Sequence, residues 1–501
     1  MMKKNRKFRR RGGRYFWLLT GLLFAVFPVA GQINLSLEQA KKLALENNER
    51  VQVASEQLQT AKFLRKAAFT QFLPSFSANG TYTHLTKQFQ LLNEDKFLPV
   101  IPYTALDNQG HLNPAALSNP AVTVSTLVIN PATGQPVTDS KGNPVFQNYS
   151  WLPASESQFG SKNIWLLQAG FTQPLFMGGK ILETYKIAKY TEELAGSAYD
   201  QKVSELLYDV EMAYWRVVSL QEKEKLAQTY RKAVSDFIEN LRNYYQEGSV
   251  TKNDLLKGQV KLNEADLAVM KAGDGSSLAQ MALCQLIGMP MNVKVFPVDT
   301  LPADLAFNTS EQIDSAVDES RPELQQLART VDIARSGVKL MRSRFLPNLA
   351  LTGGPLYSNP NPYKGFSNDF GDDFMIGVVC NIPIFHWGER VHTMQAAEHE
   401  QKAVELKLKE ARELIGLQLN QSKFLLQEAG QKVLLSSKAL EQAQENLSFT
   451  QSRFAEGMMK ASDVLEAQAQ WQKSWSDAID ARADLKLSYC NYLKAAGKLN
   501  Q

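Results

Sequence analysis

Two long stretches of the chain carry apolar residues at heptad spacing among charged and amide side chains, without a single proline. They run from residue 180 to 247 and from 389 to 456, and each is 68 residues long. The repeating apolar positions of the first stretch are Val203, Leu206, Val210, Ala213, Val217, Leu220, Ala227, Val234, Phe237 and Leu241. A seam this narrow is typical of coiled-coil packing. At 1.5 Å per residue, each predicted helix would be about 100 Å long.

Each stretch is predicted to end in a tight turn and to return as a shorter helix. Gly248 and Gly457 stand where a left-handed residue ends a helix. Asn253-Asp254 and Ser462-Asp463 follow as candidate N-caps of the return helices. The chain is therefore predicted to contain two long helical hairpins.

The two hairpins belong to an internal repeat. A shift of 209 positions matches the pairs Pro174 and Pro383, Phe176 and Phe385, Gly248 and Gly457, and Gly288 and Gly497. A shift of 273 matches helices 36–72 and 309–345, each of which ends in Phe-Leu-Pro. We expect two structural repeats, 32–300 and 301–501, rather than several globular domains.

The shorter helices are expected to stack end to end. Ser36 and Gln39 form a capping box at the start of helix 36–72. Helices 254–287 and 309–345 have 34 and 37 residues, and their sum of 71 nearly equals the 68 of a long helix. We expect these two to stack, and helix 463–497 to stack on helix 36–72.

Four segments alternate with the period of a strand. Phe76, Ala78, Gly80 and Tyr82 alternate with polar residues, and similar alternation occurs at 165–172 and 374–381 and in the segment after the second Phe-Leu-Pro. A strand of a soluble sandwich could have this pattern. Strands of about 10 residues with one apolar face also suit a membrane barrel.

The two shifts differ by 64 residues, which measures an insertion in the first repeat. It lies at about 84–163 and is rich in Pro, Asn, Gly and Ser. We expect a long surface loop here, with room for a hairpin of its own.

The N-terminus is typical of an export signal. Residues 1–31 carry eight Lys or Arg and no acid. The basic residues lie in 1–14, a short apolar run follows at 15–29, and small residues precede Gln32. The remainder has 47 basic and 51 acidic residues, so the formal charge of +4 does not indicate nucleic acid binding. An exported chain without a further long apolar run is predicted to lie in the periplasm, the medium or a β-barrel membrane.

Candidate chemistry is sparse, and we predict no enzyme, cofactor or metal site. Gly178-Gly179-Lys180 lacks the upstream glycine and the following Ser or Thr of a phosphate-binding loop. The three cysteines are far apart, with no CxxC. His392 and His399 lie near acidic residues on a predicted helix, where a solvated face is the favoured interpretation.

The ordered, duplicated motifs resemble the TolC family of outer-membrane efflux proteins. They include the opening run 35–48, both Phe-Leu-Pro sequences, the turns at 174–179 and 383–388, and both Gly…Asp tips. The resemblance implies a mainly α fold with a small β part. It also implies a homotrimer in which three sets of four strands form a twelve-stranded barrel in outer-membrane lipid, continued by a helical tunnel. Such ducts work with a periplasmic adaptor and an inner-membrane transporter.

The resemblance also assigns candidate residues. It implies adaptor docking at the tips, Gly248, Ser249, Gly457 and Met458, and a periplasmic gate at Asp463, Glu466, Asp254 and Phe454. Glu466 replaces a family aspartate and Met459 replaces an arginine that pairs with the first hairpin, which alters the lock. Asp254 and Asp463 could instead serve only as helix caps. A periplasmic coiled-coil scaffold or adhesin without a pore is the alternative for the whole chain.

Overall fold

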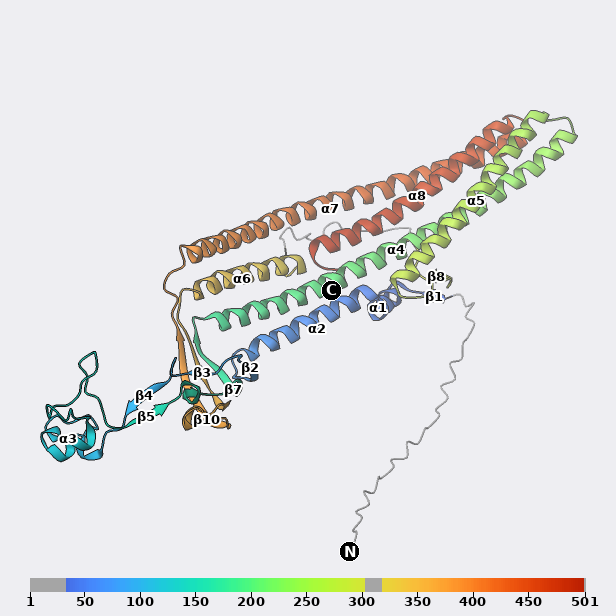
Figure 1. The fold of residues 1–501 in the computed structure, drawn as a ribbon. Helices are drawn as coiled ribbons and strands as arrows, with labels where there is room; N and C mark the ends of the chain where they lie inside the picture. The colour runs from blue at the N-terminus through green and yellow to red at the C-terminus, as the bar shows by residue number, and fades with distance from the viewer. Residues whose placement is uncertain (1–32, 302–317, 500–501) are drawn as a thin grey trace, which may run out of the picture. The chain divides into compact units, whose positions relative to one another are not determined.

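The computed structural model describes residues 33–301 and 318–499. The predicted signal peptide, 1–31, and the start of predicted helix 309–345 lie outside this part. The chain, coloured along its sequence in Figure 1, divides into two compact units. The first contains the chain up to residue 59, 193–328 and the chain from 406; the second contains 60–192 and 329–405. Both units draw segments from both halves of the sequence.

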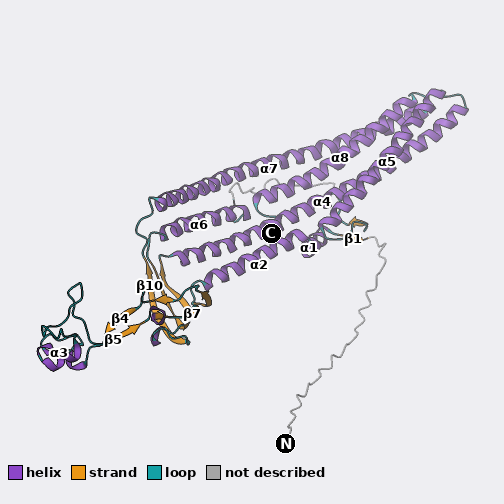
Figure 2. Ribbon diagram, in the orientation of Figure 1, coloured by secondary structure: helices purple, strands orange, loops and turns teal. Residues whose placement is uncertain are grey.

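Both long helices are present (Figure 2), and each is within one residue of the predicted length of 68. Helices α4 (Lys180–Gln246) and α7 (Glu389–Ala455) have 67 residues each. Their return helices, α5 (Lys252–Leu286) and α8 (Ala461–Ala496), have 35 and 36 residues. The predicted seam is buried at most of its positions, including Val210, Val217, Val234 and Leu241. Both predicted hairpins are therefore confirmed.

The first predicted helix is interrupted. Helix α1 (Leu37–Asn47) ends before Asn48, which is extended, and α2 (Glu49–Thr70) follows. The Asn48 side chain accepts a hydrogen bond from the Arg50 amide at 2.9 Å, as an N-cap does. The prediction of one unbroken helix was wrong because the break uses neither glycine nor proline.

Within the described residues, the predicted helix 309–345 is present as α6 (Pro322–Ser343). Residues 318–321 form a turn in which the Asp318 carboxylate accepts from the Ser320 amide at 2.8 Å. Pro322 then occupies the first helical position, where its missing N–H has no intrahelical partner to lose.

The short helices meet end to end, but with exchanged partners. The end of α5 meets the break between α1 and α2, where Asn48 Nδ2 donates to the Leu286 carbonyl at 2.9 Å. The end of α8 meets the start of α6, where Arg321 Nη1 donates to the Ala495 carbonyl at 2.9 Å. The predicted stacks of 254–287 on 309–345, and of 463–497 on 36–72, were wrong because the lengths fit either pairing.

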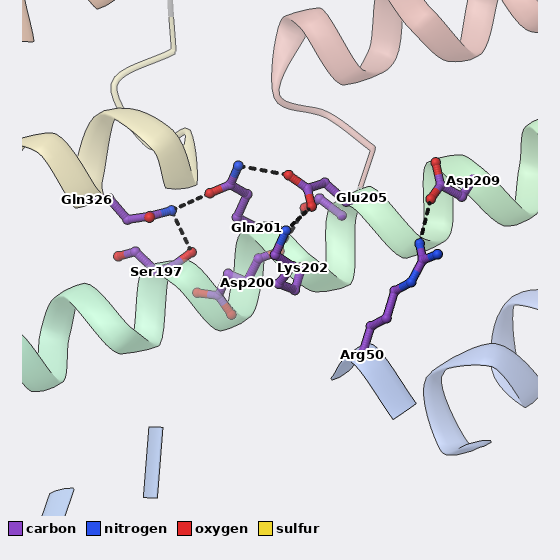
Figure 3. A network of polar contacts seen from close by, with 9 residues as sticks. Arg50, Ser197, Asp200, Gln201, Lys202, Glu205, Asp209 and Gln326 are labelled. Atoms are coloured by element: carbon purple, nitrogen blue, oxygen red, sulfur yellow. Dashed lines mark hydrogen bonds and ion pairs between the residues drawn. The ribbon is translucent and has the colours of Figure 1, made fainter. Parts of the chain in front are cut away.

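Polar contacts secure the start of α6 against its neighbours. Glu319 accepts two hydrogen bonds from Arg412 of α7, at 2.9 and 3.1 Å. On the other side, Gln326 Nε2 donates to the Ser197 carbonyl at 3.4 Å and to Oε1 of Gln201 at 2.6 Å, both on α4 (Figure 3). Side chains rather than chain length therefore select the partner of α8.

Replacing Arg321 with alanine should lower the free energy of unfolding of the first unit by about 1.5–3 kcal/mol. The reason is the loss of the buried, charge-assisted hydrogen bond from Arg321 to the Ala495 carbonyl. Arg321 is only 4% exposed. Arg329→Ala is the control, since its half-exposed pair with Asp332 should contribute less than about 1 kcal/mol. Urea unfolding followed by far-UV circular dichroism measures both variants. Equal midpoints would show that Arg321 does not hold the two helix ends together.

A buried core of the first unit lies where β1 (Ile33–Leu35), α1, β8 (Val295–Pro297) and the end of α5 pack on α4. Strand β1 pairs in parallel with β8. The buried Tyr214 hydroxyl of α4 lies 2.9 Å from the Leu35 carbonyl and 2.6 Å from the Asp299 carboxylate. Burial raises the pKa of Tyr214 above its usual value, so the phenol stays protonated and can donate.

The second unit contains a four-stranded antiparallel sheet in the order β10-β9-β7-β2. Its strands are β2 (Ser75–His84), β7 (Asn163–Met177), β9 (Asn348–Asn359) and β10 (Gly371–Asn381). All four predicted strands are present. Within the described residues, β2 and β10 each pair on one side only, so the sheet has two open edges.

The insertion has small elements of its own. Strand β4 (Lys96–Pro99) pairs with β5 (Tyr149–Leu152), and β3 (Phe89–Gln90) pairs with β6 (Gln158–Phe159). Beyond them lies the short helix α3 (Pro120–Thr126). The insertion leaves after β2 and returns before β7, at the sheet end opposite that joined to the helices. The expected hairpin is present.

Candidate functional site: hairpin tips and sheet

The two hairpin tips have the same hydrogen-bonded turn. Gly248 and Gly457 have φ values of +75° and +74°. In the first tip the Ser249 amide donates to the Tyr244 carbonyl at 2.8 Å, and in the second Met458 donates to the Arg453 carbonyl at 2.9 Å. A second bond from each glycine amide completes a Schellman motif. The predicted left-handed helix ends are confirmed.

The predicted N-caps were wrong by a few residues. Thr251 caps α5, and Asp254, at the third helical position, accepts from the Thr251 amide at 3.2 Å. Lys460 precedes α8, and Asp463 accepts from its amide at 3.1 Å. An aspartate at this position reaches back one turn, so the helix begins before it rather than at it. Asp254 and Asp463 both perform capping in the single chain.

Phe454 connects the two hairpins near their tips. Its ring lies 5.3 Å from Phe237 and 5.7 Å from Tyr244 of α4, edge to face in both cases. It packs beside a buried cluster that joins α4 to α8 and consists of Phe237, Leu241, Ala461, Val464 and Leu465. An aromatic contact at this position holds the tips of one chain together.

The second tip carries an exposed acidic pair. Asp463 and Glu466 are exposed and lie three residues apart, so they share one face of α8. Met458 beside them is 67% exposed, whereas Met459 is partly buried. Asp254 is partly buried at the other tip, so the structure places the predicted gate residues at both tips but does not bring their side chains into one cluster.

One face of the sheet is mainly apolar, and the other mixes polar, small and apolar residues. Cross-strand neighbours on one face are apolar or small, as in Phe76 opposite Phe171 and Ile376 opposite Gly353. The other face pairs Ser75 with Thr172 and Ser77 with Gly170. Phe76 is 79% and Ile376 67% exposed. An exposed apolar face of this kind is suited to lipid.

None of the helices in 33–301 and 318–499 is long and apolar enough to span a membrane. The same residues contain no group of three or more His, Cys, Asp or Glu side chains with metal-binding geometry.

The contact between the two hairpins was not predicted from the sequence. It involves the aromatic partners of Phe454 and a buried seam on α8. Phe237 and Leu241 were already part of the heptad seam of α4, and Val464, Trp471 and Ala478 continue such a seam on α8. Heptad spacing could have found both sides of this contact.

Comparison with known proteins identifies the class. The family model described as "Outer membrane efflux protein" matches residues 145–289 and 315–498. The alkaline protease secretion protein AprF of Pseudomonas aeruginosa is 23% identical over 338 residues, covering 66% of this chain and 69% of AprF. The outer membrane protein TolC of Vibrio cholerae is 25% identical over 351 residues, covering 67% and 78%.

Solved structures agree with this fold. The CmeC outer membrane channel of Campylobacter jejuni superposes with a TM-score of 0.66 at 16% identity, covering 92% of this chain and 86% of that one. VceC of Vibrio cholerae has a TM-score of 0.67 at 13% identity, covering 92% and 96%.

The family match and the curated relatives thus identify an outer-membrane channel rather than an enzyme. The chain belongs to the outer membrane efflux protein family, whose members include exit ducts for efflux and secretion. It is a protein of the outer membrane of a Gram-negative bacterium.

Proposed function

We propose that three copies of this chain close into one passive duct through which an inner-membrane pump delivers its substrates. The observation that carries the proposal is the four-stranded sheet with an apolar face and two open edges. Each unpaired backbone group would cost several kcal/mol in lipid. Four strands are too few to enclose a lumen, because about eight are needed. Pairing β2 of one copy with β10 of the next removes every edge, and three copies give twelve strands.

The helices support the same assembly. Helix α5 carries an apolar stripe that its own chain leaves exposed, and we name it the α5 stripe: Leu256, Val260, Leu267, Met270, Leu278 and Met281. Its spacing of three, four or seven residues, with one longer step, follows a helix face. An exposed stripe of this length indicates a partner helix. A second copy of this chain is the partner that the sheet edges also require.

The tips would then form the periplasmic entrance. Three copies bring three Asp463 and three Glu466 side chains around one axis, where their negative potential favours cations. Asp254 and Phe454 would hold each tip in place, the first by capping α5 and the second by packing on α4. With Met459 in place of the family's arginine, this lock depends on aromatic packing more than on an ion pair.

Members of the family form trimeric channels that work with adaptor proteins and inner-membrane pumps. In this chain we assign adaptor docking to the exposed tips, with Gly248 and Ser249 on one and Gly457 and Met458 on the other. The flexible apolar side chain of Met458 suits such a contact. The sequence contains no phosphate-binding loop, so the energy for transport would come from the pump.

The assembly is tested by mass photometry of the purified protein in detergent, where a trimer is expected. Val260→Asp with Leu278→Asp places charges in the α5 stripe and should leave monomers. Gln259→Asp with Ser277→Asp adds the same charge at neighbouring exposed positions and should assemble normally. A monomer that inserts into membranes and conducts would overturn the proposal.

Replacing residues 86–161 with Asn-Gly should leave assembly intact. The elements of the insertion pair with one another, and the Leu85 amide already bonds the Lys162 carbonyl at 2.7 Å, so a two-residue turn can close the β2–β7 hairpin. We place the insertion outside the cell, over the mouth, and expect equal or larger single-channel conductance. Failure of the shortened chain to form trimers would show that the insertion is part of the wall.

A further inference from the structure

One polar side chain interrupts the apolar seam of α8 near its tip. The seam positions follow one another at spacings of four and three residues: Val464, Gln468, Trp471, Trp475 and Ala478. Gln468 is 0% exposed, the most completely buried amide side chain among the described residues. A polar residue at a coiled-coil core position fixes the register of the helices at a cost in stability.

The contacts of Gln468 are incomplete. Its Nε2 donates to the Ala233 carbonyl of α4 at 3.3 Å, whereas its Oε1 has no hydrogen-bond partner within the described residues. Apolar clusters flank it on both sides. The one toward the tip includes Phe237 and Val464, and the other includes Val234 and Trp471. The Gln468 amide therefore lies between two apolar clusters that join the hairpins.

The contacts of Gln468 weaken the packing of α8 against α4. Ala233 lies inside α4, so its carbonyl already accepts a helical hydrogen bond and gains little from a second donor. The unpaired Oε1 has lost its water without replacement, which is the costlier half of a broken hydrogen bond. Gln468 thus specifies where α8 lies on α4 while weakening their contact.

We infer that Gln468 is a positioning residue of the entrance, which keeps the contact between α8 and α4 reversible so that the α7–α8 hairpin can move. A small displacement would admit water to Oε1 and remove the cost of burying it, while the apolar clusters restore the register afterwards. This inference rests on the proposed duct function, but its first measurement does not.

The experiment compares the full-length protein with Gln468→Leu and Gln468→Met, which keep the volume and remove the unpaired oxygen. Hydrogen–deuterium exchange over residues 461–475 should slow by about ten-fold in both, because local opening would now separate apolar contacts only. In planar bilayers, both variants should lengthen the dwell times of conductance states and reduce open-channel noise. Gln259→Leu, at the equivalent position of the first repeat and exposed on α5, should change neither.

Two results would overturn the role proposed for Gln468. Faster exchange in Gln468→Leu and Gln468→Met would show that the amide only stabilises the packing, and this would overturn the inference. Slower exchange with unchanged dwell times would also overturn it, since the residue would then have no role in movement. If the wild-type protein forms no channel, the proposed function fails, whatever the exchange data show.

Discussion

Gly354→Val is expected to abolish formation of the sheet, and with it the recovery of the protein from the outer membrane. A Cβ at Gly354 would lie 2.1 Å from the Ala169 carbonyl oxygen and 2.6 Å from the Gly170 Cα, both on the neighbouring strand β7. The φ of Gly354 is +154°, which a β-branched residue does not adopt. Backbone atoms cannot give way as a flexible side chain can, so a loss above about 4 kcal/mol is expected.

Gly377→Val is the matched control. Gly377 lies on β10, has no atom within 4 Å of a built Cβ, and has no positive φ. The Gly377→Val protein should assemble like the wild type, with the same heat-modifiable migration on gels and the same membrane fractionation. Wild-type behaviour of Gly354→Val would mean that β7 and β9 do not approach as closely as the structure has them.

The long helices could be predicted almost to the residue because their ends are encoded locally. Gly248 and Gly457 end α4 and α7 through a backbone conformation that glycine favours. Pro74 and Pro347 directly precede strands β2 and β9. The alternation of the strands likewise shows which face is apolar. The order of the strands depends on pairing between distant segments, so periodicity predicted the strands but not their neighbours.

The end-to-end contacts could not be predicted in the same way. Stacking was inferred from lengths, and the lengths fit two arrangements equally. The choice depends on two buried polar side chains, Asn48 on the end of α5 and Arg321 on the end of α8. Neither forms part of a periodic pattern, and each acts on a carbonyl more than 170 positions away in sequence.

The candidate site was predictable in place but not in detail. The Gly…Asp runs located both tips, and the resemblance supplied roles for eight residues. The spacing did not reveal that the aspartates stand at the third helical position, because an acid there and an acid at the cap look alike in sequence. The contact of Phe454 with α4 required the fold, since Phe237 lies more than 200 residues earlier.

Charge removal at the second tip is expected to reduce the cation selectivity of the channel several-fold. Asp463→Ala with Glu466→Ala removes two exposed carboxylates from each chain, and three chains surround one entrance. Cation block should weaken with it, because the local potential that concentrates cations is lost. Ion permeability ratios measured in planar bilayers under a salt gradient test this expectation, and Glu441→Ala with Glu445→Ala removes the same charge from the exposed side of α7 as the control.

A second pair of variants separates charge from capping. Asp463 accepts a hydrogen bond from the Lys460 amide, so Asp463→Ala also removes a cap, at a cost of about 1 kcal/mol. Asp463→Asn with Glu466→Gln keeps an acceptor at that position and removes only the charge. It should lose selectivity as fully as the alanine pair while keeping wild-type stability. If the asparagine–glutamine pair conducts like the wild type and the alanine pair is only less stable, these acids serve the helix and not the pore.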